Sequence, residues 1–331
     1  MKGTFTRRGF VAGSAAASMM LSPSIRKAAA DTAVPVRWAS LQPGFTVLPV
    51  QFILANKLGL KNGLSMPDPM PYTAVSTYYN DFVAGNYDVC IGSWDTFAAR
   101  YQAGVPIKYL CTITDANMIA LLAPKTGVSD VSQLKGKTIA ALQSTGTYRM
   151  VKALIKESNG FDIEKDATIQ NVDNPAASVT LLMADRADAA LSWEPNITTG
   201  LIKKPDLRVI FKAGDAYHKI AKGAGDLPYF GVGIRQELID KHPGIAAKVG
   251  NMFKECLQGI NTDVTKTVDL FGSRTGVPND ILKEAMGSKR LAFNYKPMSD
   301  AAARGTVVKA SEFLARNGLL KKPVDDNFFA V

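Results

Sequence analysis

Short runs rich in Val and Ile alternate with segments of helical period along most of this chain, and this alternation constrains the fold more than any other feature. It is typical of βαβ units, in which helices connect the strands of a mostly parallel sheet. In the first series, the pattern predicts strands at 34–40, 87–92 and 107–114 and helices at 47–58, 72–86 and 93–104. We therefore expect an α/β protein.

A second series with the same pattern follows Pro124. It predicts strands at 137–142, 168–172, 187–193 and 207–211, and helices at 147–158, from Asn174 past Met183, and after Pro195. The segment 227–235 then leads back to long amphipathic helices. A chain of about 300 residues exceeds what one hydrophobic core organises. We expect one lobe from 31–122 with 230–331, a second lobe from 123–229, and two crossing strands that form a hinge.

The first thirty residues have the order of an export signal. They contain the pair Arg7-Arg8, an apolar stretch that ends at Ile25, and three alanines at 28–30. The stretch is shorter than the ~20 apolar residues that a membrane-spanning helix needs. We predict twin-arginine export to the periplasm with cleavage near Ala30, and the Sec route is the alternative.

Charge gives little support for a nucleic-acid partner. The formal net charge of the whole chain is +10, and five of its basic residues but no acidic residue lie within 1–30, which leaves +5 for residues 31–331. The remaining basic residues occur singly or in short pairs such as Lys203-Lys204, without an Arg-rich stripe. After residue 30, no apolar stretch is long enough to predict a membrane span.

Several short segments resemble motifs of enzymes or metalloproteins, but each lacks a required residue at the required spacing. GKT at 136–138 lacks the upstream glycine of a nucleotide-binding loop, because Val131 stands there, and Gln236 interrupts a dinucleotide fingerprint that would begin at Gly231. His218 and His242 lack a second ligand at metal-binding spacing. We expect no catalytic residues, no cofactor and no metal.

The three cysteines, Cys90, Cys111 and Cys256, exclude a disulfide-dense scaffold. Cys90 and Cys111 fall in runs that we predict to be neighbouring strands. The sequence leaves two possibilities for Cys90 and Cys111: a disulfide between them, or two buried free thiols.

Three stretches carry a family resemblance: FVAGNYDVCIGSWDTFAARYQAGVPIKYL (82–110), LKGKTIAAL (134–142) and NPAASVTLLMADRADAALSWEP (174–195). They resemble the nitrate, sulfonate and taurine family of ABC-transporter substrate-binding proteins. The resemblance implies a two-lobed, type II periplasmic binding protein fold. It also implies a monomer that catalyses no reaction and delivers a small molecule to a membrane permease and its ATPase.

Ligands of open α/β sheets bind at the carboxyl ends of strands, where helix N-termini offer free N–H donors. The loops predicted at these ends contain the ligand-binding candidates Gln42, Gly44, Phe45, Ser93, Trp94, Asp95, Ser144, Thr145, Gly146, Thr147, Trp193 and Glu194. Four further candidates are Arg149, in the first turn of a helix, Asp115 and Asn117, near the first crossing, and Tyr229, in the returning strand. The alternatives are that the hydroxyls only cap helices and that the two tryptophans are core residues.

The scattered aromatic residues and few fixed charges favour a small organic anion, sulfonate-like, taurine-like or an aromatic acid, as the ligand. Glu194 could instead receive a cationic group. Another possibility is an exported enzyme or a sensor on the same fold that acts on a pyrimidine-like heterocycle.

Overall fold

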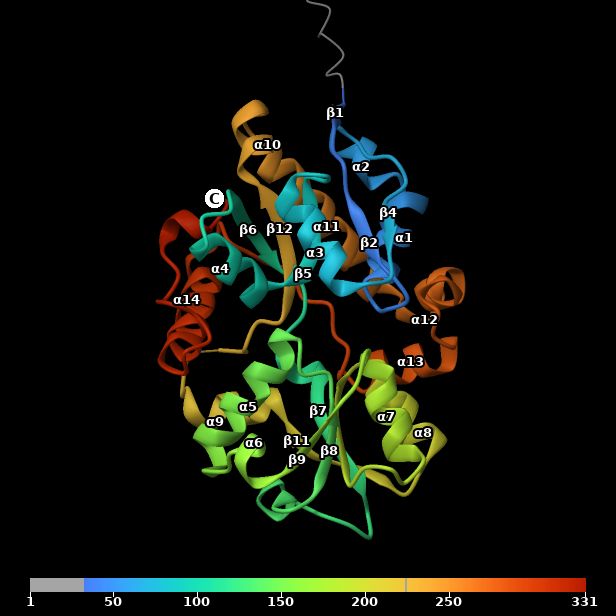
Figure 1. Ribbon diagram of the computed structural model, residues 1–331. Helices are drawn as coiled ribbons and strands as arrows, with labels where there is room; N and C mark the ends of the chain where they lie inside the picture. Colours follow the sequence, from blue (N-terminus) through green and yellow to red (C-terminus); the bar gives the residue numbers. More distant parts are fainter. Residues whose placement is uncertain (1–32, 224) are drawn as a thin grey trace, which may run out of the picture. The chain divides into compact units, whose positions relative to one another are not determined.

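The structure is a computed structural model that describes residues 33–223 and 225–331. The predicted export signal and its cleavage site lie outside these residues. Two β-sheets flanked by helices organise the described chain (Figure 1), and we call the halves built on them the first and the second lobe. The predicted α/β class with two lobes is confirmed. Within the described residues, every helix is too short or too polar to cross a bilayer.

The first lobe contains a four-stranded sheet with the order β13-β6-β12-β5. Its strands are β5 (Val89–Ser93), β6 (Ile107–Thr112), β12 (Phe230–Arg235) and β13 (Lys296–Pro297). Two parallel pairs precede it in the chain: β1 (Val34–Pro35) with β3 (Leu64–Ser65), and β2 (Ala39–Leu41) with β4 (Met70–Tyr72). Trp38, which lies between β1 and β2, forms a single β-bridge with Val89 of β5. This bridge places the N-terminal segment beside β5.

The returning strand β12 lies between β5 and β6 and is antiparallel to both. The prediction that Cys90 and Cys111 lie on neighbouring strands is therefore wrong, because a strand more than a hundred residues later in the chain separates them. Both thiols are free and buried, as is that of Cys256.

Helices from both ends of the chain cover the first lobe. From the N-terminal half come α1 (Val47–Ala55), α2 (Leu58–Lys61), α3 (Val75–Ala84) and α4 (Trp94–Gln102). From the C-terminal part come α10 (Gln236–Lys241), α11 (Ile245–Thr262), α12 (Val264–Phe271), α13 (Asn279–Gly287) and α14 (Ala301–Arg316). The buried residues of α11 recur at helical spacing, from Val249 through Phe253 to Leu257 and Ile260, so this helix turns one apolar face to the core.

The second lobe contains a five-stranded sheet with the order β11-β7-β10-β8-β9. Its strands are β7 (Ile119–Pro124), β8 (Thr138–Ala141), β9 (Thr168–Asn171), β10 (Ala189–Trp193) and β11 (Leu207–Lys212). The three strands β8, β9 and β10 are parallel, whereas β7 is antiparallel to both of its neighbours. The predicted lobe boundary between residues 122 and 123 falls inside β7.

The helices of the second lobe are α5 (Gly146–Asn159), α6 (Ile163–Asp166), α7 (Pro175–Met183), α8 (Asn196–Lys203) and α9 (Ala213–Ile220). Asn174 caps α7 through its side chain and Pro175 follows as the first helical residue, as the sequence predicts. A small apolar cluster that includes Leu122, Val179 and Ile197 joins α7 and α8 to the sheet.

Two segments join the lobes, and they run side by side. The backbone N–H of Ala116 donates to Leu227 O at 2.8 Å, and the N–H of Tyr229 donates to Thr114 O at 3.0 Å. Asp115 and Pro228 form an isolated antiparallel bridge between these contacts. The chain therefore leaves the first lobe and returns to it through one hydrogen-bonded pair of segments.

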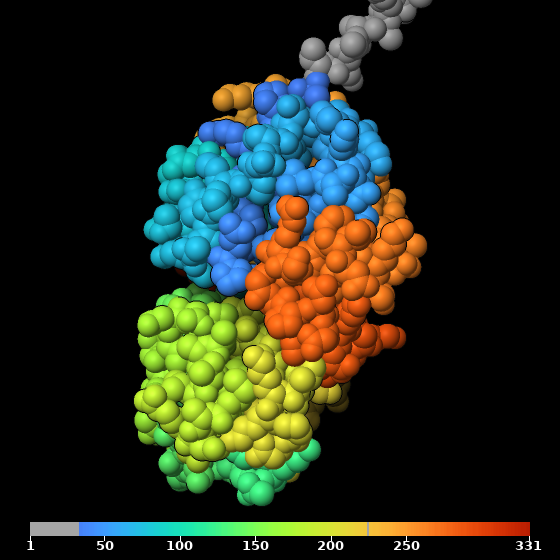
Figure 2. Space-filling view, turned by 90° about the vertical axis from the view of Figure 1, so that its right-hand side faces the viewer, coloured from blue at the N-terminus to red at the C-terminus, as the bar shows by residue number. Residues whose placement is uncertain are grey.

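The C-terminal helices also contact the second lobe, at two separate places (Figure 1). Phe313 of α14 packs edge-on against Tyr217 of α9 with ring centroids 5.8 Å apart. Residues around α13 meet α8, where orange and yellow atoms touch in Figure 2. Contacts between the lobes therefore extend beyond the crossing.

We predict that Gly231→Ala lowers the free energy of unfolding by about 1–3 kcal/mol, the usual cost of overpacking a core. A Cβ at this position of β12 would lie 2.1 Å from Tyr109 Oη and 2.3 Å from Cys111 O. The matched control is Gly305→Ala in α14, where no atom lies within 4 Å of the added Cβ. It should raise stability by about 0.5–1 kcal/mol through helix propensity. Urea denaturation of both variants checks this, and equal effects would contradict the packing argument.

Candidate functional site

Helices α4 and α5 begin at the carboxyl ends of β5 and β8, where the sequence predicts ligand contacts. Ser93 is the N-cap residue of α4, and Asp95 lies in the first turn of that helix. Thr145 is the N-cap residue of α5, and its Oγ1 accepts a hydrogen bond from the N–H of Tyr148 at 3.2 Å. The capping alternative therefore holds for Thr145, which is nevertheless half-buried at the loop surface.

The carboxylate of Asp95 connects the two helix starts. It is buried, with 9% of the residue exposed, and accepts a hydrogen bond from Ser93 Oγ. A Cβ added to Gly146 would lie 2.0 Å from Asp95 Oδ2, so the carboxylate of the first lobe touches the backbone at the start of α5 in the second. Burial raises the pKa of Asp95, and the Ser93 hydrogen bond and the positive charge of Arg149 oppose this increase.

A second polar contact between the lobes lies close by. The hydroxyls of Thr147, on α5, and Tyr229, in the returning segment, are 2.6 Å apart, and both residues are buried. The negative charge of Asp95 adds to the effect of burial in raising the pKa of Tyr229. We use the name interlobe cluster for Ser93, Asp95, Gly146, Thr147 and Tyr229.

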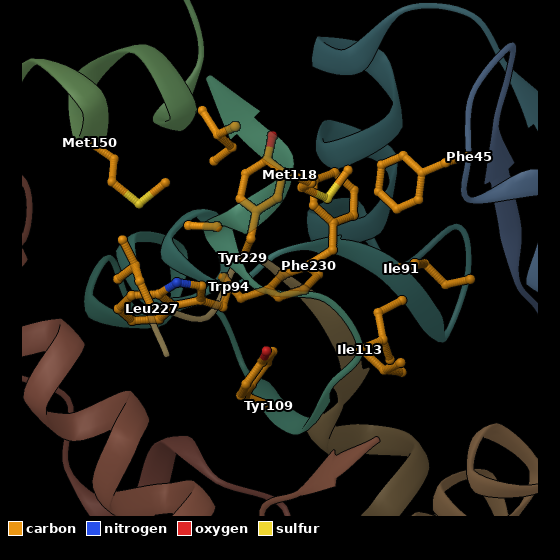
Figure 3. Packing of buried hydrophobic residues seen from close by; sticks show 14 of the residues in the cluster. Phe45, Ile91, Trp94, Tyr109, Ile113, Met118, Met150, Leu227, Tyr229 and Phe230 are labelled. Atoms are coloured by element: carbon orange, nitrogen blue, oxygen red, sulfur yellow. The ribbon is translucent and has the colours of Figure 1, made fainter. Parts of the chain in front are cut away.

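An aromatic row extends from this cluster into the first lobe (Figure 3). The rings of Tyr229 and Phe230 have centroids 4.8 Å apart, and Phe45 packs edge-on against Phe230 at 5.1 Å. Figure 3 also shows Met118, from the turn in the connection, and Met150, from α5. Of the interlobe cluster, Tyr229 therefore belongs to this buried apolar packing.

The two candidate tryptophans differ in role. Trp94 is fully buried, and its Nε1 donates to Pro228 O at 2.7 Å, so it ties α4 to the crossing segment as a core residue. Trp193, the last residue of β10, is half-buried and packs against the core. Of the two tryptophans, Trp193 is the one that keeps contact with solvent.

Glu194 is fully buried, and its partners lie within the chain. Its carboxylate accepts hydrogen bonds from Thr198, both N–H and Oγ1, and from Arg290 Nε at 2.6 Å. Arg290 follows α13, so this ion pair links the C-terminal part to the second lobe. Nothing in the sequence around Arg290 indicates this partnership, because the two residues are 96 positions apart.

Asp115 and Asn117 lie at the crossing, and Asp115 is bridged to Pro228, the residue before Tyr229. They line a hollow of about 480 Å³ beside the crossing, which shares Asp226, Asn261, Phe293 and Asn294 with a second hollow of about 570 Å³. Asp115 accepts a hydrogen bond from the N–H of Asn117 at 3.0 Å, and its burial raises its pKa. Asp115 thus serves as the cap of a short 3₁₀ turn in the connection.

The remaining candidates are the loop residues Gln42, Gly44 and Ser144, and Arg149 in the first turn of α5. The backbone N–H of Gln42 donates to Tyr72 O at 2.8 Å and that of Gly44 donates to Thr275 O at 2.9 Å, whereas Ser144 and Arg149 are exposed. The sequence analysis missed Ser40, whose buried Oγ has no hydrogen-bond partner among the described atoms. Its position one residue before the end of β2 is a signal that could have identified it. Residues 33–223 and 225–331 contain no group of three His, Cys, Asp or Glu side chains placed to hold a metal.

Comparison with known proteins supports the resemblance described above. Residues 61–215 match the family model described as NMT1/THI5 like. The matched segment spans less than half of the chain. The match covers α4, α5 and the strand ends that hold the interlobe cluster, apart from Tyr229. No curated protein matches the sequence.

Solved structures share the fold of this chain. The periplasmic aliphatic sulphonate binding protein SsuA from Escherichia coli is 16% identical, with a TM-score of 0.72 over 90% of this chain and 92% of its own. The alkanesulfonate-binding protein SsuA from Xanthomonas axonopodis pv. citri, bound to MOPS, is 15% identical, with a TM-score of 0.67 over 87% and 94%. The Candida albicans CA3427 gene product, described as having the generic periplasmic binding protein fold, is 17% identical, with a TM-score of 0.61 over 89% and 92%.

We predict that Arg290→Met lowers the free energy of unfolding by about 3 kcal/mol, because it leaves the buried Glu194 carboxylate without its cation. The matched control is Arg316→Met, which removes the ion pair with Glu157 between α14 and α5. Both partners of that pair are partly exposed, so its loss should cost about 1 kcal/mol or less. Urea denaturation distinguishes the two, and a larger loss for Arg316→Met would contradict this account.

Proposed function

We propose that this protein is the periplasmic solute-binding component of an ABC importer. The observation that carries the proposal is the interlobe cluster. Polar groups from both lobes meet at strand ends and helix N-termini, next to the hydrogen-bonded crossing. The family match and the shared fold support it.

In the proposed mechanism, the lobes part at the crossing and admit a small molecule between the start of α5 and the loop before α4. The hydroxyl of Thr145 and the indole of Trp193 contact the ligand from the second lobe, and Phe45 supports the opposite wall through Phe230. Closure then presents both lobes together to a membrane permease, whose ATPase supplies the direction of transport. The protein itself catalyses no reaction and works as a monomer.

The export route belongs to the same proposal. Twin-arginine export with cleavage near Ala30 would deliver the chain to the periplasm, where a solute-binding protein meets its permease. The choice of a small organic anion, sulfonate-like, taurine-like or aromatic, as the ligand stays a prediction from the sequence.

A thermal-shift screen of residues 31–331 tests the binding function. The panel contains sulfonates, carboxylates, nitrate, amines and heterocycles. A ligand at a hundred times its Kd stabilises the folded state by about 2.7 kcal/mol, a readily visible shift. We expect a saturable hit whose ligand-induced shift is reduced in Trp193→Ala and Thr145→Ala.

The matched control for Thr145→Ala is Thr180→Ala, on the exposed face of α7. Thr145 also caps α5, so Thr145→Ala changes the melting temperature of the unliganded protein. The quantity compared is therefore the rise in melting temperature that the ligand causes within each variant. A hit that all three variants bind like the wild type would place binding elsewhere in the protein.

A further inference from the structure

The interlobe cluster is closed to solvent in this structure. Its four side chains, those of Ser93, Asp95, Thr147 and Tyr229, belong to residues that are at most 9% exposed. Neither of the two hollows near the crossing is lined by a residue of this cluster. If the ligand binds at the cluster, as the proposed function requires, it can enter only after the lobes part. A contact that holds the lobes together then regulates ligand entry.

The side chain of Arg290 makes two hydrogen bonds to the second lobe. Its Nε donates to Glu194 Oε1 at 2.6 Å, and its Nη2 donates to Thr198 Oγ1 at 2.8 Å. Glu194, which follows β10, and Thr198, on α8, are both fully buried, and the Arg290 side chain is only 24% exposed. Charge-assisted hydrogen bonds are strong where water is largely excluded. This contact is therefore a firm attachment to the second lobe.

The chain that follows Arg290 is anchored in the first lobe. The backbone N–H of Asn294 donates to the carbonyl oxygen of Ile113, directly after β6, at 2.8 Å. The ring of Phe293 lies against that of Phe45, with centroids 6.3 Å apart. Because only a few residues separate these anchors from Arg290, its backbone stays with the first lobe. Parting of the lobes on this side therefore breaks the hydrogen bonds of Arg290 to the second lobe.

A second carboxylate lies within reach of the same guanidinium. Glu284 Oε1, on α13, is 3.9 Å from Arg290 Nη2, and the Glu284 side chain is 56% exposed. Glu284 lies on the helix just before Arg290, so this pairing does not depend on the position of the second lobe. Arg290 thus has one carboxylate partner across the lobe contact and another on its own side of it.

We propose that Arg290, Glu194 and Thr198 form an interlobe latch that keeps the ligand-free protein closed, and that Arg290 exchanges Glu194 for Glu284 when the lobes part. A buried ion pair at such a contact biases the balance between two arrangements of the lobes. Since a ligand meets only the open fraction, the latch lowers the apparent affinity for the ligand.

A second ion pair between the lobes contributes less to this balance. Arg316 of α14 pairs with Glu157 of α5, but their side chains are 47% and 26% exposed. Water competes with an ion pair of this exposure, and its strength falls accordingly. The open-to-closed ratio therefore depends mainly on the interlobe latch.

Double electron–electron resonance on ligand-free residues 31–331 tests the latch. Spin labels are placed on Ile202→Cys, in α8, and Leu270→Cys, in α12, two exposed positions on either side of the contact between α8 and α13 (Figure 1). The three native cysteines are buried, so the label attaches to the introduced thiols. We expect one short-distance population with the native latch. In Glu194→Gln, the ratio of a longer-distance to the short-distance population should rise at least about tenfold.

The matched control is Glu284→Gln, which removes the other carboxylate near Arg290 and should leave the protein closed. Arg290→Met is a second latch variant if Glu194→Gln disturbs folding, which circular dichroism checks. An open protein with the native latch, two latch variants with unchanged distances, or equal opening in Glu284→Gln and Glu194→Gln would overturn the proposal. The measurement needs no ligand. A ligand screen without a hit would therefore count against the proposed function and not against the latch.

Discussion

The paired crossing between the lobes is the constraint on which the rest of the structure depends. Backbone hydrogen bonds join Ala116 to Leu227 and Thr114 to Tyr229, so the two connections form one hydrogen-bonded unit. Trp94 fixes α4 to the same unit through Pro228, and Tyr229 reaches from it to Thr147 of the second lobe. The geometry at the strand ends therefore follows from a few contacts at the crossing.

The alternation of strands and helices, and with it the two sheets, could be predicted from the sequence because periodicity and capping are local properties. The order of strands in the first sheet could not. Insertion of β12 between β5 and β6 depends on a return over more than a hundred residues, and it separates Cys90 from Cys111. Strand β7 was not predicted, because it directly follows the crossing and the segment between the two series of strands was assigned to the connection.

For the candidate site, the sequence located the loops at the strand ends but not the direction of each side chain. The two candidate tryptophans differ in burial. Trp94, the first residue of α4, is held in the core by Pro228, whereas Trp193, the last residue of β10, is half-buried. Glu194 resembles a ligand contact in sequence, yet Arg290 satisfies it from 96 positions away. The approach of Asp95 to Gly146 likewise depends on how two lobes meet, which no local pattern contains. The C-terminal helices add further contacts to the second lobe, so Arg290 and Arg316 join the lobes as well as the crossing.

The most direct test of the account is a crystal structure of residues 31–331 with the strongest hit of the ligand screen. The account predicts density for the ligand between the start of α5 and the loop before α4, in contact with Trp193 and Thr145. Density in the hollow lined by Asn261 and Phe293, with the interlobe cluster unchanged, would contradict it.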